Sequence, residues 1–91
     1  MSVNIVIPTL LRKLTGDSDL VELEAGTVTE VLEKLDENYP GFRARVCEPS
    51  GDLRQFINIY VNGEDIRYSK GVETPLKDGD EMSIIPAVSG G

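Results

Sequence analysis

Residues 27–41 read TVTEVLEKLDENYPG, and this stretch decides which fold the chain can adopt. Its apolar residues recur at helical spacing and form one stripe: Val28, Val31, Leu32, Leu35 and Tyr39. Thr27 and Glu30 have the spacing of a capping box, in which each side chain bonds a backbone N–H near the start of a helix. Pro40 disfavours the helical conformation for the residue before it, and Gly41 follows. The stretch therefore predicts one helix over about 27–38, whose single apolar face can cover one face of one sheet.

The segments on both sides of this helix alternate apolar and polar residues, as strands packed on one face do. Before the helix lie VNIVIP (3–8) and LVELEAG (20–26), and after it lie FINIYVNG (56–63) and EMSIIP (81–86). Asn62-Gly63 predicts a tight turn, because both positions tolerate positive φ, and Asp78-Gly79 predicts a second turn. We expect a short helical turn over 42–46 and a short extended piece at DIRY (65–68).

The order strand, strand, helix, strand, short strand, strand indicates an α+β fold. The first two strands form a hairpin-like pair, and the helical crossover returns the chain parallel to the sheet. A mixed sheet packed on one main helix is the β-grasp, or ubiquitin-like, architecture. We expect a β-grasp domain over 1–86 and a flexible C-terminal Gly-Gly tail over 87–91.

Length and charge restrict the function classes. The chain has 91 residues, enough for one core, and a net charge of −7. An acidic surface argues against nucleic acid and anionic membranes as partners. The sequence shows no apolar run of membrane-spanning length and no signal peptide, and its one cysteine cannot form an internal disulfide. Together these features predict a cytoplasmic location.

The residue types available argue against catalysis by this chain itself. It contains no His, the commonest general base and metal ligand, and no phosphate-binding loop of the Walker type. The clustered carboxylates of Asp17, Asp19, Glu22 and Glu24 lack the spacing of a calcium loop, so we expect no metal site. Without a His partner, Cys47 is interpreted as a small, partly buried hydrophobic residue rather than a reactive thiol. We therefore expect a protein that is not an enzyme and binds no cofactor.

The last residues, IIPAVSGG (84–91), offer a different kind of chemistry. If a partner enzyme couples the α-carboxylate of Gly91 to AMP, sulfur can displace AMP and leave a thiocarboxylate, or an amine can attack. Ala87, Val88, Ser89 and Gly90 would thread the partner's active site. From Ala87 to Gly91 the chain can reach about 17 Å, at roughly 3.4 Å per residue. Two glycines without side chains let a narrow channel close around their backbone.

The motifs LKDGDEMSIIPAVSGG, FINIYVNGEDIR and IPTLLRKLTG resemble those of the ubiquitin-like sulfur-carrier family of MoaD/ThiS type. This family includes the small subunit of molybdopterin synthase and the thiamin-pathway sulfur carrier. The start, the middle strand with its turn, and the length of the middle connection are most similar to the CysO-type branch of cysteine biosynthesis. Ser89 departs from the Ala or Thr usual in the family, but it is small enough to thread.

The resemblance implies partners and a reaction cycle. An E1-like enzyme would adenylate Gly91 with ATP and Mg²⁺, and a sulfur donor would form the thiocarboxylate. A pyridoxal-phosphate cysteine synthase would supply an acceptor for the sulfur, and a zinc metalloprotease would release cysteine and restore the Gly-Gly end. The alternatives are the small sulfur-carrying subunit of molybdopterin synthase, acting with its large subunit, and a protein modifier that forms isopeptide bonds. A plain interaction domain with an idle tail also stays open.

Strand alternation predicts a docking surface for such a partner. If Met82 and Ile84 pack on the helix, Ile85 points away from it. By the same parity, Phe56 and Tyr60 point away from the helix-facing residues of their strand. Exposed apolar residues beside a reactive tail would form a partner-binding surface, unless the 41–55 connection folds over them.

Overall fold

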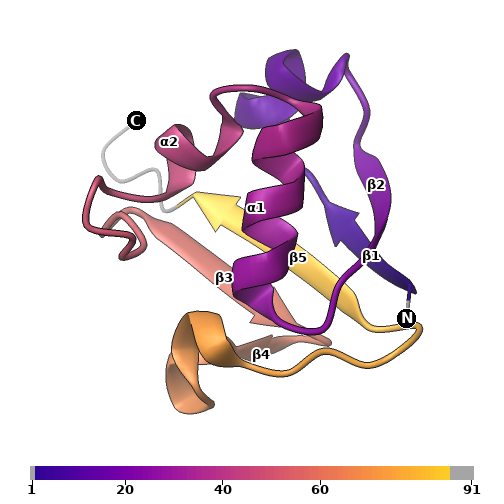
Figure 1. Ribbon diagram of the computed structural model, residues 1–91, viewed down its shortest axis with the longest axis vertical. Coiled ribbons are helices and arrows are strands. Elements are labelled where there is room, and N and C mark those ends of the chain that lie inside the picture. The colour runs from indigo at the N-terminus through magenta and orange to yellow at the C-terminus, as the bar shows by residue number, and fades with distance from the viewer. Residues whose placement is uncertain (1, 87–91) are drawn as a thin grey trace.

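The computed structural model describes residues 2–86, and a five-stranded sheet of order β2-β1-β5-β3-β4 forms its centre (Figure 1). The strands are β1 (Ser2–Val6), β2 (Leu20–Glu24), β3 (Ile57–Val61), β4 (Glu64–Asp65) and β5 (Glu81–Pro86). The α-helices are α1 (Val28–Asn38) and α2 (Phe42–Val46), and three short 3₁₀ helices span Thr9–Thr15, Ile66–Tyr68 and Gly71–Glu73.

The sheet is mixed, as the sequence predicts. β1 pairs antiparallel with β2 and parallel with β5, while β3 pairs antiparallel with both β5 and β4. The strand that comes last in the sequence therefore lies in the middle of the sheet, between β1 and β3. This arrangement confirms the β-grasp fold.

The start of α1 shows the predicted capping box. The Thr27 hydroxyl accepts a hydrogen bond from the backbone N–H of Glu30 at 3.2 Å. The Glu30 carboxylate reaches back and accepts from the N–H of Gly26 at 3.0 Å. Both bonds satisfy N–H groups that have no partner within the helix, which fixes its first residue at Val28.

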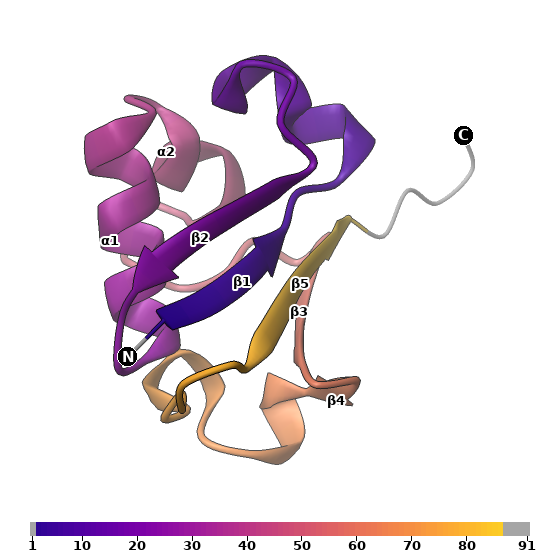
Figure 2. The same cartoon turned by 90° about the vertical axis from the view of Figure 1, so that its right-hand side faces the viewer.

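Both α-helices pack on the same side of the sheet (Figure 2). The predicted α1 stripe is buried at Val28, Val31, Leu32 and Leu35, whereas Tyr39 is half-buried. The Asp36 carboxylate, near the end of α1, accepts hydrogen bonds from the N–H groups of Gly41 and Arg43 in the chain that follows. Gly41 lies at φ 96°. The link through Asp36 turns the chain into α2 and places Phe42, which is fully buried, in the core. The helical turn expected over 42–46 is confirmed.

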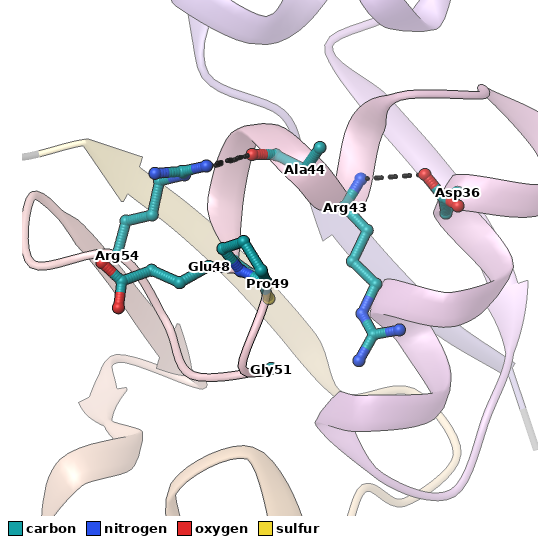
Figure 3. Close-up of a pocket in the computed structure, with 8 residues that line it drawn as sticks. Asp36, Arg43, Ala44, Glu48, Pro49, Gly51 and Arg54 are labelled. Carbon is teal, nitrogen blue, oxygen red and sulfur yellow. Dashed lines mark hydrogen bonds between the residues drawn. The ribbon is translucent and has the colours of Figure 1, made fainter.

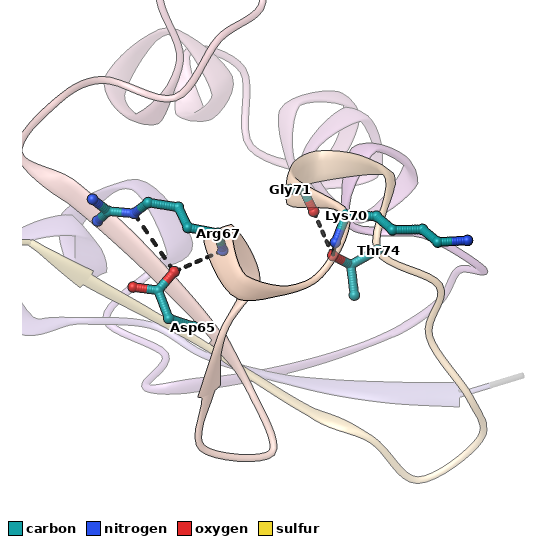
Figure 4. Close-up of polar contacts among 5 residues, drawn as sticks. All are labelled: Asp65, Arg67, Lys70, Gly71 and Thr74. Atoms are coloured by element: carbon teal, nitrogen blue, oxygen red, sulfur yellow. Dashed lines mark hydrogen bonds and ion pairs between the residues drawn. The ribbon is translucent and has the colours of Figure 1, made fainter.

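Two connecting segments are more regular than their sequences indicate. The turn-rich link between β1 and β2 is a 3₁₀ helix over Thr9–Thr15, with Leu11 and Thr15 buried. The expected extended piece at 65–68 is wrong beyond its first residue, because Ile66–Tyr68 forms a 3₁₀ helix. Asp65 caps that helix, accepting the N–H of Arg67 at 2.8 Å and pairing with its guanidinium (Figure 4). Ile66 is buried, and a helical turn brings it into the core.

The expected boundary between domain and tail falls at the limit of the described residues. The division into a domain over 1–86 and a tail over 87–91 stays a prediction, because residues 87–91 lie outside the described residues. Within residues 2–86, no helix is long and apolar enough to cross a membrane.

Candidate functional site: the C-terminal strand and its surroundings

β5 carries the candidate site, because it leads directly into the Gly-Gly end of the sequence. It is hydrogen-bonded on both sides, to β1 and to β3. Its alternation is the predicted one: Met82 and Ile84 are buried, whereas Ile85 is 46% exposed. β1 pairs only with Glu81 to Ser83, whereas β3 pairs with β5 as far as Pro86. The pairing with β3 and the two core side chains therefore fix the position of Pro86, the last residue of the strand.

The turn that begins β5 is fixed by polar contacts. The Asp80 carboxylate accepts from the Asn62 side-chain amide at 2.9 Å and from the Lys77 N–H at 2.8 Å. The first of these bonds is the main reason why the pKa of Asp80 lies below its ordinary value. The Asn62 side-chain oxygen in turn accepts from the N–H of Glu81 at 3.0 Å. The D-G-D-E motif therefore ties β5 to the turn after β3.

Both predicted turns have the backbone conformation they require. Asn62 and Gly63 lie at φ 52° and 86°, as a two-residue hairpin turn demands, and Gly79 lies at φ 87°.

The three residues predicted to bind a partner fall into two places. Asn58 lies directly opposite Ile85 and Tyr60 opposite Ser83, so Tyr60 is a diagonal neighbour of Ile85 on the outer face. Tyr60 is half-buried. Phe56 precedes β3 and is 50% exposed, and it lines a hollow with Arg45 and Pro86 at the end of the sheet. The connection over 41–55 therefore leaves Phe56 and Ile85 accessible, and their role in binding stays a prediction.

The residues predicted to react lie beyond the described part. Gly91 and the threading residues Ala87, Val88, Ser89 and Gly90 are outside residues 2–86, so their roles stay predictions. Within the described residues, no group of three or more His, Cys, Asp or Glu side chains could hold a metal ion.

Cys47 follows the last residue of α2 and lines a cavity of about 300 Å³. Figure 3 shows this cavity with Arg43, Glu48 and Pro49 among the residues around it. The Cys47 side chain is buried, and this burial raises the pKa of the thiol, although the Arg43 guanidinium opposes the shift. A thiol with a raised pKa stays protonated at neutral pH and is a poor nucleophile. The interpretation of Cys47 as a packing residue is consistent with this environment, and its burial is more complete than expected.

We predict that Cys47→Ser keeps the chain's capacity to carry sulfur at its C-terminus. The hydroxyl costs roughly 1 kcal/mol in a buried site, at the low end for such groups because Arg43 can donate to it. Urea unfolding measures the loss of stability, and thiocarboxylate formation by the same preparation measures the capacity to carry sulfur. A folded Cys47→Ser chain that accepts no sulfur would reassign the chemistry to this thiol.

Comparison with known proteins places this geometry in a family. The ThiS family model matches residues 5–91, which includes every strand except the start of β1. The chain belongs to the ThiS family. Its β5 and the Gly-Gly sequence that follows are therefore part of the region that this family shares.

Individual proteins are similar to the chain over nearly its full length. The chain is 45% identical over 93 residues to the sulfur carrier protein CysO of Mycobacterium tuberculosis, with 100% of each chain covered. The structure is similar to a chain of the Amycolatopsis orientalis BexX/CysO complex, at a TM-score of 0.91 and 44% identity, covering 98% and 99% of the two chains. It is also similar to small archaeal modifier protein 1 of Methanosarcina acetivorans, at 0.86 and 35%, covering 99% and 96%.

The residues that surround Pro86 were not predicted from the sequence. Leu10 from the first 3₁₀ helix and Arg45 from α2 line the same hollows as Pro86. They come from separate segments of the chain, so no local pattern could have grouped them. Leu10 could have been suspected as a binding residue, because it is a large apolar residue in a turn-rich link.

Proposed function

We propose that this chain is a sulfur carrier whose Gly91 is adenylated by a partner enzyme and converted to a thiocarboxylate, which donates sulfur for cysteine biosynthesis. The observation that carries the proposal is the similarity to CysO, a sulfur carrier protein, at 45% identity over the full length of both chains. The alignment includes Gly91, the residue that supplies the reacting group.

The chemistry requires only a carboxylate from this chain. The Gly91 carboxylate attacks the α-phosphate of ATP, releases pyrophosphate and forms a mixed anhydride with AMP. A sulfur nucleophile then attacks the carbonyl carbon, the C–O bond to AMP breaks, and the thiocarboxylate remains. An E1-like partner would bind ATP and Mg²⁺, and downstream partners would hold pyridoxal phosphate and zinc. The chain would thus act as a co-substrate rather than an enzyme, and its cytoplasmic location remains a prediction.

The folded part of the chain fixes the point from which the C-terminal residues start. Met82 and Ile84 anchor β5 in the core, and Ile85 is exposed beside the exit of the strand. A partner that docks on the outer face near Ile85 would therefore meet the tail in a defined direction. Such preorganisation lowers the entropic cost of placing the reacting carboxylate.

The cysteine branch can be tested with the thiocarboxylate form of the chain. Incubation with a pyridoxal-phosphate cysteine synthase and an activated serine should give a cysteine adduct. Its mass should exceed that of the thiocarboxylate by one aminoacrylate (C3H5NO2), because the S–H group adds across the aminoacrylate double bond. Transfer of sulfur to a molybdopterin synthase large subunit, with no cysteine adduct, would contradict the cysteine branch in favour of the molybdopterin alternative.

A protein-modifier function is the second candidate, favoured by the similarity to small archaeal modifier protein 1. In this case an amine, rather than sulfide, would attack the adenylate or a derivative of it. Isopeptide bonds between Gly91 and lysine side chains, detected by mass spectrometry of cell extracts, would support this candidate. If such bonds are absent from cells that contain the thiocarboxylate, sulfur carriage is the function that remains.

We predict that Ile85→Asp weakens binding to the activating enzyme by well over 1 kcal/mol, which is more than a fivefold rise in Kd. The physical reason is that a buried interface anchor would be replaced by a charge. Because Ile85 is 46% exposed in the free chain, the melting temperature should barely change. Calorimetric titration and thermal melts measure the two effects. Tyr68→Asp is the matched control, since Tyr68 is 87% exposed and lies in the 3₁₀ helix Ile66–Tyr68 rather than in β5. Unfolding of Ile85→Asp, or unchanged binding by the folded variant, would show that the surface is assigned wrongly.

A further inference from the structure

The end of the sheet where β5 finishes has a local charge opposite to that of the whole chain. The chain carries 16 acidic and 9 basic residues. A groove of about 710 Å³ nevertheless runs beside Pro86 with Lys13 and Arg45 in its lining. A second hollow, of about 230 Å³, shares Arg45 and Pro86 with it and adds Arg54. Within residues 2–86, no acidic side chain lines either of them.

The two cations that line the larger groove are available for a ligand. Lys13 and Arg45 are exposed, and neither side chain forms an ion pair or hydrogen bond with another described residue. Arg54 differs, because its guanidinium donates two hydrogen bonds to the carbonyl of Ala44, at 3.1 and 2.9 Å. Arg54 therefore holds the connection against α2, whereas Lys13 and Arg45 present uncompensated positive charge.

Exposed apolar side chains flank these cations. Leu10 is 66% exposed and Phe56 is 50% exposed, and both line the hollow that Arg45 and Pro86 share. Large apolar residues around a hollow mark an interaction site more often than a plain solvated surface. A small inorganic anion would contact only the cations and would leave Leu10 and Phe56 exposed to water. A segment with both acidic and apolar side chains would use all of them.

We propose that this groove and the adjoining hollow, which together are lined by Leu10, Lys13, Arg45, Phe56 and Pro86, form one site, called the groove below. This site binds an acidic protein segment that carries at least one large apolar side chain. The proposal rests on the proposed function in one respect, since the segment belongs to a partner that handles the C-terminal residues. Pro86 precedes Ala87 directly, so a protein that engages residues 87–91 lies next to the groove. The net charge of −7 repels an oligonucleotide, which carries one charge on every phosphate, more strongly than a peptide with a few carboxylates, and this favours a protein segment.

The binding test uses the full chain and a synthetic peptide of alternating Glu and Leu. Nuclear magnetic resonance titration should perturb the amides of Leu10, Lys13, Arg45 and Phe56. A matched peptide with Lys in place of each Glu should leave these amides unperturbed. Equal perturbation by both peptides, no perturbation by the acidic peptide, or tighter binding of a single-stranded oligonucleotide would each overturn the proposal.

Charge reversal gives the second test. Lys13→Glu/Arg45→Glu should weaken binding of the acidic peptide at least tenfold and gain affinity for the basic one. Lys70→Glu/Lys77→Glu is the matched control, because it changes the net charge equally and both side chains are exposed outside the groove. The Lys70 ammonium extends away from the contacts around Thr74 (Figure 4). Equal effects of the two double variants would overturn the proposal, because they would show that peptide binding depends on the net charge of the chain and not on the residues of the groove.

Activation by the partner separates this proposal from the proposed function. The Lys13/Arg45 reversal should lower kcat/KM for thiocarboxylate formation at least tenfold at physiological salt, and the Lys70/Lys77 control should not. Unchanged kcat/KM in both variants would contradict the groove as a partner site. A wild-type chain that forms no thiocarboxylate would contradict the proposed function, and the peptide titration would still decide the groove.

Discussion

Deleting Gly91 is expected to abolish thiocarboxylate formation and leave the folded body unchanged. The reacting group is the α-carboxylate of this residue, and Gly90 would present its carboxylate one residue short, by about 3.4 Å. Misplacing a reacting group by 1 Å can already cost about 100-fold in rate, so the expected loss is at least that large. Within residues 2–86 the core residues lie between Val3 and Ile84, and Gly91 has no side chain to bury, so the melting temperature should not move.

Two further variants sharpen this prediction. Adding an alanine after Gly91 moves the carboxylate the other way and should be equally inactive. Ser89→Ala keeps the length and the Gly-Gly end, so it should form the thiocarboxylate normally. Normal thiocarboxylate formation by the chain that lacks Gly91 would sink the hypothesis that this carboxylate carries the sulfur.

Phe42→Ala should destabilise the domain by about 3–5 kcal/mol, the largest expected effect of any single core change. Phe42 is fully buried, and it is the largest of the fully buried side chains within the described residues. Its removal leaves a cavity where α2 meets the core, next to the link that Asp36 makes from α1. In a domain of this size the melting temperature should fall by at least about 12 °C.

Phe56→Ala is the matched control for this core prediction. The same side chain is removed from a position that is 50% exposed, so the cost should be below about 1 kcal/mol. Urea unfolding of both variants measures the difference. Similar losses for the two would show that burial does not distinguish these phenylalanines and that the core is assigned wrongly.

The features predicted well from the sequence are those fixed by neighbouring residues. The Thr27–Glu30 spacing gives the start of α1, because both capping bonds join residues at most four apart. The Asn62-Gly63 pair gives its turn, because positive φ is a property of those two residues. Alternation along 81–86 predicts that Ile85 points outward, since a strand's faces follow directly from parity.

The features that were missed depend on contacts between distant segments. Nothing within 81–86 shows that β5 inserts between β1 and β3, since that pairing joins residues far apart in sequence. Parity predicts an outward side chain for Phe56, which is 50% exposed, but it does not predict that Phe56 shares a hollow with Arg45 and Pro86. The cations beside Pro86 come from two separate helices, so only the folded chain brings Lys13 and Arg45 together.

Intact mass spectrometry can show whether Gly91 carries the sulfur. The full chain is incubated with the E1-like activating enzyme, ATP and sulfide, and fragmentation locates any modification. We expect a mass gain equal to the replacement of one oxygen by sulfur, located on Gly91, and dependent on ATP. An unmodified chain in the presence of an activating enzyme that thiolates its own CysO-type carrier, or sulfur located on Cys47, would contradict it.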